Sequence, residues 1–472
     1  MFDMPIGNHA IVIGGSISGM LAARVLSESF THVTVLERDR YGDGPALRKG
    51  QPQGWHVHLI LARGRMELER LFPGLGPDLE AAGAVCFQWS EGARVNGPFG
   101  WLPDYTSDRL LVRGSTRALL DWHVRDHLLR LPNVRMEEGC AVKGLLTDPS
   151  RRAVTGVRVA RDSGDSEIYG DLVVDTSGRA SASLKWLEEI GCAAPPESVV
   201  DCHLAYSCRW YEAPKDASSG WKLISTQPKA PDDPLSAAIF PIEGDRYIGG
   251  LATIGLKSVP EDDAGFLELA KSLRTPEFHA WFSAAKPLSP IYTFRQAPNR
   301  VRHFERVPDL PDRYLPMGDV VGTLNPIYGQ GITLAALSAL TLGDSLARAS
   351  GPDPLSAAVR SHLQRLPREV YATPWIMAAL GDSLWPGTTI AVQSRFQRWL
   401  LREPWLWLFR RFSVAINRMA AEDPELARGL MEVMHMIKPP AEVLNGRLMR
   451  RAFWRMFRAP RPVPGVVPAP SR

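Results

Sequence analysis

The stretch HAIVIGGSISGMLAARVLSESFTHVTVLE, residues 9–37, decides the fold of this chain. It joins a short apolar run at residues 10–13 to a second run at residues 32–36 through a glycine-rich turn and a segment compatible with a helix. Continuous apolar, β-branched runs of this length are typical of strands that are buried on both faces in a parallel sheet. We therefore predict a strand, a tight turn, a helix and a second strand parallel to the first.

The turn in this unit is a variant of the pattern GxGxxG, whose glycines turn the chain, let backbone N–H groups approach a pyrophosphate and pack the helix on the strand. Ser16 takes the place of the second glycine, and a serine still permits close approach while adding a hydroxyl. Glu37 ends the second strand, where an acidic side chain accepts hydrogen bonds from a ribose 2′-hydroxyl. The pattern predicts a dinucleotide with an unphosphorylated adenosine ribose; the alternative is a crossover that binds nothing. The candidate residues of the turn are Gly14, Gly15, Ser16, Ser18 and Gly19.

Composition and charge are those of a globular protein with one unusual segment. The 472 residues predict about three domain-sized units, and 45% of them are hydrophobic. Residues 385–472 hold 15 basic and 6 acidic side chains, a local charge of +9 against +4 for the whole chain. The five cysteines form no CxxC pair, which argues against a disulfide framework and a thiolate metal site and favours a reducing, cytoplasmic location. Residues 1–8 do not resemble a secretion signal, and the uncharged window 320–343 predicts a loop and buried helix rather than a membrane span.

A second glycine-rich stretch, RYLPMGDVVGTLNPIYGQGITLAALSALTLGDSLA at residues 313–347, has the pattern of a strand, a loop and a long helix. Gly329, Gln330 and Gly331 open that helix, whose first turn presents free N–H groups and a partial positive charge to an anion. Asp319 follows the strand and can accept two hydroxyls, although an aspartate that caps a helix would also explain it.

Between these two stretches lies DLVVDTSGRAS, residues 171–181, a buried strand that ends in a polar turn. The carboxyl end of a strand is where α/β sheets place ligands. Residues 141–147 and 154–160 predict a hairpin, and residues 116–131 predict a helix. Residues 201–255 alternate apolar and polar side chains and are rich in aromatics, so we expect a separate, mostly antiparallel sheet there.

The three stretches GGSISG with Glu37, DLVVDTSGRAS, and MGDVVGTLNPIYGQG resemble the blocks of the flavin-dependent monooxygenases with the para-hydroxybenzoate hydroxylase fold. The resemblance covers roughly the first three quarters of the chain. It implies bound FAD, with the first stretch at the adenosine and pyrophosphate, Asp319 on the ribityl chain and the helix start at residues 329–331 facing the flavin N1 and O2 edge. Within this family, LRKGQPQGWHVHLILARG, STRALLDWHVR and LNPIYGQG are most similar to bacterial epoxidases of polyether biosynthesis.

The resemblance implies a set of cofactor-binding residues and leaves the catalytic residues unnamed. Arg117 would lie near the pyrophosphate. Residues near the flavin or the substrate would be His56, His58 and Tyr328, for which packing and hydrogen bonding within the protein are the alternative. No metal site is expected. The full cofactor set is Gly14, Gly15, Ser16, Ser18, Gly19, Glu37, Arg38, Arg117, Asp175, Gly178, Gly318, Asp319, Pro326, Gly329, Gln330 and Gly331.

One departure from the family pattern concerns the source of electrons. The block between the two flavin stretches normally has an aspartate directly before its glycine, but here Ser177 precedes Gly178 and Asp175 lies two residues earlier. NADH or NADPH is therefore expected to supply electrons either directly, with Asp175 as a substitute, or through a separate flavin reductase.

The expected fold class is α/β, or α+β overall, with a Rossmann-like FAD-binding domain, an inserted, mostly antiparallel substrate-binding sheet and a C-terminal helical appendage. Residues 1–75, 111–195 and 296–348 would form the FAD-binding domain. Residues 76–110 would be a loop-rich segment near the substrate domain, residues 196–295 the substrate domain and residues 349–472 the helical region.

Three functions agree with these patterns. The first is a monooxygenase that inserts one oxygen atom from O2 into a small hydrophobic unsaturated substrate, as an alkene epoxide of natural-product biosynthesis or, in the runner-up, as a phenol. Epoxidation needs no protein base, in agreement with the lack of a recognisable acid–base constellation. The second is an FAD-dependent reductase or dehydrogenase of isoprenoid lipids. The third is a flavin-binding carrier or membrane-associated scaffold. No nucleic acid partner is expected.

The C-terminal stretch RLMRRAFWRMFR, residues 447–458, predicts a strongly amphipathic helix. A helical wheel separates its apolar side chains from its arginines, including Arg458. Such a helix lies either on a membrane surface or on its own protein, so peripheral membrane contact is one expectation. The apolar arc is Met449, Ala452, Phe453, Met456 and Phe457.

Overall fold

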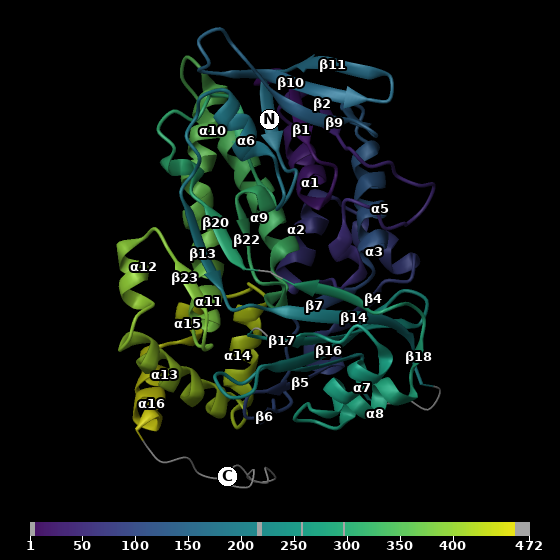
Figure 1. Cartoon of the computed structure of the whole chain (residues 1–472), viewed down its shortest axis with the longest axis vertical. Coiled ribbons are helices and arrows are strands. Elements are labelled where there is room, and N and C mark those ends of the chain that lie inside the picture. The colour runs from purple at the N-terminus through teal and green to yellow at the C-terminus, as the bar shows by residue number, and fades with distance from the viewer. Residues whose placement is uncertain (1–4, 215–219, 256–257, 296–297, 458–472) are drawn as a thin grey trace.

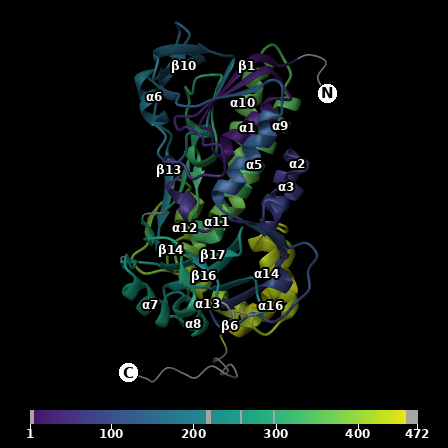
Figure 2. The ribbon, with the colours of Figure 1, turned by 90° about the vertical axis from the view of Figure 1, so that its right-hand side faces the viewer.

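The computed structural model describes residues 5–214, 220–255, 258–295 and 298–457. Figure 1 shows a parallel sheet with its helices in the upper half of the molecule and a large antiparallel sheet in the lower half. Helices of the last quarter of the chain, in yellow-green and yellow, cover one side of the lower half (Figures 1 and 2).

The parallel sheet has five strands in the order β21-β12-β1-β2-β8, in which residues 10–13 pair with both neighbours. All four side chains of that central run are buried, as the apolar pattern predicts. The strands are β1 (Gly7–Ile13), β2 (Phe30–Leu36), β8 (Val134–Glu137), β12 (Leu172–Asp175) and β21 (Tyr314–Pro316). The helices of this domain are α1 (Ile17–Leu26), α2 (Ala62–Leu71), α5 (Arg117–Leu129), α6 (Ser183–Glu189) and α9 (Gly331–Ala347).

A small antiparallel sheet extends from this domain and confirms the hairpin predicted at residues 141–160. It consists of β9 (Ala141–Thr147), β10 (Val154–Arg161) and β11 (Gly164–Tyr169). Short 3-10 turns complete the domain at η1 (Pro52–Trp55), η2 (Phe304–Arg306), η3 (Gly318–Val320) and η4 (Pro326–Tyr328).

The lower sheet has eight strands and is antiparallel except for one pair, as expected from the alternating pattern of residues 201–255. The helices α7 (Asp263–Lys271) and α8 (Glu277–Ala284) pack on it through an aromatic cluster that includes Tyr211, Trp281 and Phe282. The strands are β5 (Ala93–Gly97), β6 (Gly100–Trp101), β14 (Ala205–Glu212), β15 (Leu223–Thr226), β16 (Leu235–Ile242), β17 (Arg246–Thr253), β18 (Lys286–Pro287) and β19 (Tyr292–Arg295).

The segment 76–110 is more regular than the loop-rich segment that its glycines predict. Strand β5 pairs in parallel with β15, so part of this segment belongs to the lower sheet itself. Such short strands are stabilised by their neighbours rather than by their own sequence, which is why they escape a pattern search. The other elements here are α3 (Leu75–Ala81), β4 (Val85–Gln88), α4 (Trp89–Gly92), and the partners of β4 in a three-stranded sheet, β7 (Leu111–Gly114) and β3 (Leu59–Ile60).

Two antiparallel strands carry the chain into the lower sheet and back. β13 (Glu197–Asp201) pairs with β20 (Asn299–Arg302), and β22 (Gly322–Thr323) and β23 (Thr389–Ala391) flank this pair. Residues 197–201 were assigned to the substrate domain; in the structure they pair with the returning strand β20 and not with the eight-stranded sheet, because the outgoing and returning chains satisfy each other's backbone hydrogen bonds.

The C-terminal region is predominantly helical, as expected. Among the described residues no helix is long and apolar enough to cross a membrane. Arg458 lies outside the described residues. The elements are α10 (Pro354–Arg365), the π-helical turn η5 (Leu366–Tyr371), α11 (Ala372–Asp382), α12 (Arg395–Leu400), α13 (Trp405–Ala420), α14 (Pro424–Met434), α15 (Pro440–Val443) and α16 (Gly446–Met456).

Candidate functional site

The glycine turn between β1 and α1 requires glycine at two positions. Gly14 has φ +98°, and a Cβ there would lie 2.9 Å from the carbonyl oxygen of Thr176. A Cβ on Gly19 would lie 1.8 Å from the carbonyl oxygen of Gly14, so only glycine lets α1 pack this closely on the strand end. Both glycines therefore shape the turn as the sequence pattern predicts.

The N-terminus of α1 faces donors that suit an anion. Ser16 precedes the helix, and its hydroxyl accepts hydrogen bonds of 2.8 Å each from Gln51 and Arg117. The first turn of α1 contains no acidic residue, and the buried hydroxyl of Ser18 has no hydrogen-bond partner within the described chain. An arginine, two hydroxyls and a helix N-terminus together favour a phosphate group.

Glu37 lies at the end of β2, as predicted, and is held there by buried contacts. Its carboxylate accepts a 2.8 Å hydrogen bond from the backbone N–H of Gly15 and pairs with Arg48 at 2.9 Å. Arg48 also lies 3.6 Å from Asp121. Arg38, in contrast, is exposed. The sequence pattern did not identify Arg48, Gln51 and Asp121 as residues of the site, although all three lie in the segments 47–64 and 115–125 that carry the family resemblance.

Asp319 and Arg117 connect the two glycine-rich stretches. The side chain of Asp319 is exposed, whereas its neighbours Gly318 and Val320 are buried. Desolvation by the surrounding protein raises the pKa of the Asp319 carboxyl, and the positive charges of Arg117, Arg179 and Arg300 oppose that rise. The two stretches meet in space, because a Cβ on Gly318 would lie 2.2 Å from the hydroxyl oxygen of Ser18.

The residues at the start of α9, which the sequence predicts to face a ligand, are largely exposed. Pro326, Gly329 and Gly331 are exposed, whereas Gln330 is buried. Gly329 has φ +67°, and a Cβ on Gly331 would meet no atom within 4 Å. The buried hydroxyl of Thr333, in the first turn of α9, lacks a hydrogen-bond partner in the described part of the chain. Backbone N–H groups here are thus accessible to a negatively charged group.

Asp175 lies between the two glycine-rich stretches, paired with Ile13 on one side and Pro316 on the other, but its side chain points into the protein interior. It is fully buried. Its two carboxylate oxygens accept hydrogen bonds from the backbone N–H of Ser177 and from the hydroxyls of Ser177, Ser181 and Tyr314. These bonds hold the polar turn after β12, whose Gly178 is partly exposed with φ +90°. Both oxygens of the Asp175 side chain are thus used within the protein, and its contact with a cofactor stays a prediction.

The two histidines follow η1 and contact different groups. His58 hydrogen-bonds the carbonyl oxygen of Gln53 at 2.9 Å. The His56 ring lies 4.7 Å from that of Tyr206 and 6.0 Å from that of Phe294 in the lower sheet, and its Nδ1 is unpaired among the described residues. Burial lowers the pKa of each histidine to about 4, so both rings are neutral near pH 7. His56 thus presents a neutral imidazole among aromatic side chains.

Tyr328 takes part in a buried hydrogen-bond network that was not predicted from the sequence. Its hydroxyl donates to Asp382 at 2.7 Å, and Asp382 also accepts from Asn299 at 2.6 Å and from Asn325 at 3.0 Å. Burial raises the pKa of Asp382 and holds that of Tyr328 well above its ordinary value. Tyr328 therefore anchors the loop before α9, in agreement with the packing alternative.

These groups fit FAD. The α1 N-terminus with Arg117, Ser16 and Ser18 suits a pyrophosphate, Glu37 suits a ribose, and exposed Asp319 suits the hydroxyls of a ribityl chain. The open glycines at the start of α9 leave room for a planar ring. No group of three or more His, Cys, Asp or Glu side chains with the arrangement of a metal site occurs in the described ranges.

Comparisons with known proteins agree with this geometry. No family model matches the chain. Its sequence is 31% identical over 469 residues, 94% of each chain, to Protein Rv3254 of Mycobacterium tuberculosis. Its structure resembles a triple mutant of the flavin-dependent brominase Bmp2, with a TM-score of 0.60 at 15% identity over 94% of this chain and 97% of that one. It also resembles pqsL, a probable FAD-dependent monooxygenase from Pseudomonas aeruginosa, with a TM-score of 0.54 at 18% identity over 80% and 96% of the chains. The chain therefore belongs to the family of the mycobacterial Protein Rv3254 and has the fold of the flavin-dependent monooxygenases and halogenases.

Proposed function

We propose that this protein binds FAD and is a monooxygenase that inserts one oxygen atom from O2 into a hydrophobic unsaturated substrate, as an alkene epoxide. The observation that carries the proposal is the convergence of the α1 turn, Arg117, Asp319 and the open start of α9 at the carboxyl end of one parallel sheet. Parallel α/β sheets bind their ligands at that end.

Each group has a role toward the cofactor. Arg117 and the α1 N-terminus would hold the pyrophosphate, and Glu37 the adenosine ribose. Asp319 would accept hydroxyls of the ribityl chain. The N–H groups at the start of α9 would stabilise negative charge on the edge of the flavin ring. Bound FAD, once reduced, would activate O2 and supply the oxygen that is transferred.

The lower sheet supports an apolar substrate. The side chains that it presents toward the η1 segment are aromatic, namely Tyr206, Trp210, Tyr292 and Phe294, and the Trp210 indole donates to the Trp55 carbonyl at 3.2 Å. A substrate that binds beside these aromatic rings would meet an apolar surface that excludes water and offers few polar contacts. Oxygen transfer to an electron-rich alkene needs no proton acceptor, which agrees with the neutral imidazole of His56 beside these rings.

That imidazole also supports a second candidate, hydroxylation of an aromatic substrate. The Nδ1 of His56 has no partner among the described residues, so it is available for a hydrogen bond with the hydroxyl of a phenol bound beside Tyr206 and Phe294. Replacement of His56 by alanine distinguishes the two reactions, because it would abolish phenol hydroxylation and leave alkene epoxidation within a few-fold of the unaltered enzyme.

Electrons would come from NADH or NADPH, either directly or through a separate flavin reductase. Anaerobic mixing of the FAD-loaded protein with each nucleotide, with and without an added flavin reductase, would identify the route from the loss of flavin absorbance. Buried Asp175 supports the reductase route, because it cannot reach a nicotinamide.

The decisive experiment is turnover under ¹⁸O2 with a reducing system and a panel of polyenes and phenols, followed by mass spectrometry. A product with one labelled oxygen and the properties of an epoxide supports the proposal. A labelled phenol would select hydroxylation instead. An unlabelled product that gains or loses two hydrogens would place the protein among the reductases or dehydrogenases.

A further inference from the structure

Exposed aromatic side chains are concentrated in one part of the chain. Within the described residues, every tryptophan and phenylalanine that is exposed lies between residues 396 and 457. Soluble proteins bury most of their large aromatics, so a cluster of exposed ones marks an interaction surface. They are Phe396, Trp399, Trp407, Phe453, Trp454 and Phe457, exposed by 45–65%.

The helix α16 shows that this exposure is not a failure of packing. Its Leu448, Ala452 and Met456 are buried against side chains of α13 and α14. The apolar arc predicted from the sequence is therefore divided: Ala452 and Met456 pack inward, whereas Met449, Phe453 and Phe457 lie outside. The helix is held by one apolar stripe and offers a second one to an external partner.

Contacts between rings, or between a ring and an arginine, join the aromatics of neighbouring helices into two groups. The Trp399 ring of α12 lies 5.8 Å from that of Phe396 and 4.5 Å from that of Trp405, the first residue of α13. Farther along α13, the Arg411 guanidinium lies 5.2 Å from the Trp407 ring and 5.8 Å from the Phe457 ring of α16. In Figure 1, α12, α13 and α16 follow one another down one side of the lower half.

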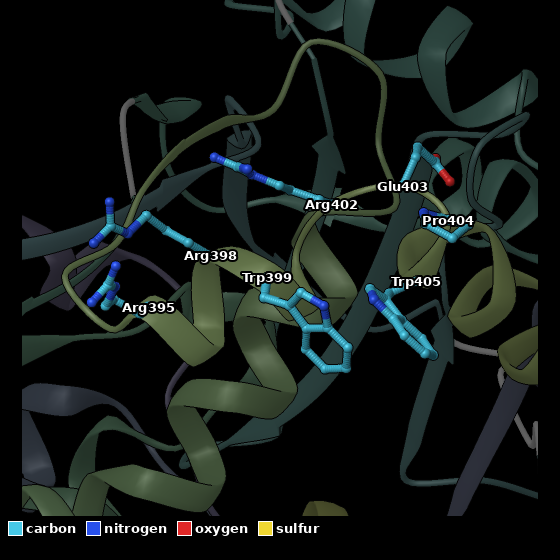
Figure 3. Close-up of a pocket in the computed structure, with 7 residues that line it drawn as sticks. All are labelled: Arg395, Arg398, Trp399, Arg402, Glu403, Pro404 and Trp405. Atoms are coloured by element: carbon cyan, nitrogen blue, oxygen red, sulfur yellow. The ribbon is translucent and has the colours of Figure 1, made fainter.

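Arginines without acidic partners accompany these aromatics. Arg395, Arg398 and Arg402 line a cavity of about 320 Å³ together with Trp399, Glu403, Pro404 and Trp405 (Figure 3). These three guanidinium groups form no ion pair with any described carboxylate. Glu403 does not neutralise them, because its carboxylate accepts from the Trp407 N–H at 3.0 Å and lies 3.9 Å from Arg410.

A second cavity, of about 460 Å³, adjoins the first. Arg398 and Arg402 border both, and Ile390, Val392 and Leu401 line the second one. Guanidinium groups pair with lipid phosphates, and tryptophan rings favour the boundary between headgroups and acyl chains. Arginines beside tryptophans and an apolar cavity therefore suit the surface of a phospholipid bilayer. On α16, exposed Arg447 and Arg450 also lack acidic partners in the described chain.

We propose that this aromatic–arginine face, made of Phe396, Trp399, Trp407, Phe453, Phe457, Arg395, Arg398, Arg402, Arg447 and Arg450, binds the surface of an anionic lipid bilayer. The aromatic rings enter the headgroup region, and the cavity on α12 receives a lipid phosphate. The charge of the face favours a lipid surface over a second copy of the chain, because a symmetric dimer would bring like charges together.

The experiment is flotation of the full-length protein with vesicles of phosphatidylcholine alone and of phosphatidylcholine with about 30% phosphatidylglycerol. We expect binding to the anionic vesicles at about 0.1 M salt and loss of binding at about 1 M salt, because the Debye length falls from about 10 Å to about 3 Å. Arg395→Gln/Arg398→Gln/Arg402→Gln should weaken binding at least tenfold. Its control, Arg109→Gln/Arg135→Gln/Arg152→Gln, changes the net charge equally at exposed arginines elsewhere and should stay within twofold.

The aromatic part is tested with Trp407→Ser/Phe453→Ser/Phe457→Ser against Leu129→Ser/Tyr169→Ser/Leu288→Ser, which removes exposed apolar side chains elsewhere. Thermal unfolding of all four variants checks that each is folded. Equal binding of test and control variants would overturn the proposal, as would equal binding to both kinds of vesicle. A dimer that the aromatic substitutions convert to a monomer, with no vesicle binding, would instead assign the face to self-association.

Discussion

Replacing Asp319 by asparagine should separate cofactor affinity from folding. The side chain is exposed and its carboxyl pKa is raised, so the ionised form gains little from the apoprotein fold. Toward a ribityl chain, however, two carboxylate oxygens can accept two hydroxyls, and a hydrogen bond to a charged group contributes about 1.5–3 kcal/mol. Asparagine keeps one acceptor oxygen, so the loss of one such bond, about 1.5–3 kcal/mol, corresponds to about a 10- to 150-fold weaker FAD affinity.

The assay is calorimetric titration of the apoprotein with FAD, together with thermal unfolding of the apoprotein. Asp319→Asn should lower the affinity by at least about tenfold and leave the apoprotein melting temperature unchanged within about 2 °C. Asp165→Asn, an exposed aspartate on β11, is the matched control. Unchanged FAD affinity in Asp319→Asn would refute the role given to this residue, and a large loss of apoprotein stability would show that the carboxylate is structural.

Three further outcomes follow from the structure. Gly19→Ala should destabilise the apoprotein or prevent folding, because its Cβ would lie 1.8 Å from a backbone oxygen; chemical denaturation measures this, and wild-type stability would contradict it. Tyr328→Phe should lower the free energy of unfolding by about 1.5–3 kcal/mol, since it removes a 2.7 Å donor from buried Asp382, and a change below about 0.5 kcal/mol would contradict the network. The protein should lose stability as pH falls from about 6.5 to about 4, because burial lowers the pKa of His56 and His362 to about 4 and the unfolded chain binds protons first; a melting temperature that stays flat over this range would contradict their burial.

Local patterns with a steric cause were read correctly from the sequence. The parallel strands, the α1 turn and the start of α9 follow from apolar runs and from glycines at which a side chain would collide or strain the backbone. The position of Asp319 at the edge of the sheet was also predicted, because this polar residue follows a buried strand, while its contact with a ligand stays a prediction. Periodicity likewise identified the lower antiparallel sheet.

Features that depend on distant partners could not be read in this way. Arg48 reaches Glu37, and Asp382 reaches Tyr328, only after the chain has folded, and neither side chain belongs to a pattern of its own. Strand β5 is stabilised by its parallel pairing with β15, which is distant in the sequence. The hydrogen bonds of Asp175 are a further example, because the turn after β12 that uses both of its oxygens forms only in the folded chain.

The bonds to Asp382 limit how this protein can be divided. The three donors, on Asn299, Asn325 and Tyr328, lie in what the sequence presents as the FAD-binding domain, whereas their acceptor lies in the C-terminal region. A chain cut after residue 348 would leave these donors without their acceptor beside the start of α9. The helical region is therefore not an independent module, and a chimera that exchanges catalytic domains between relatives must carry α11 along with them.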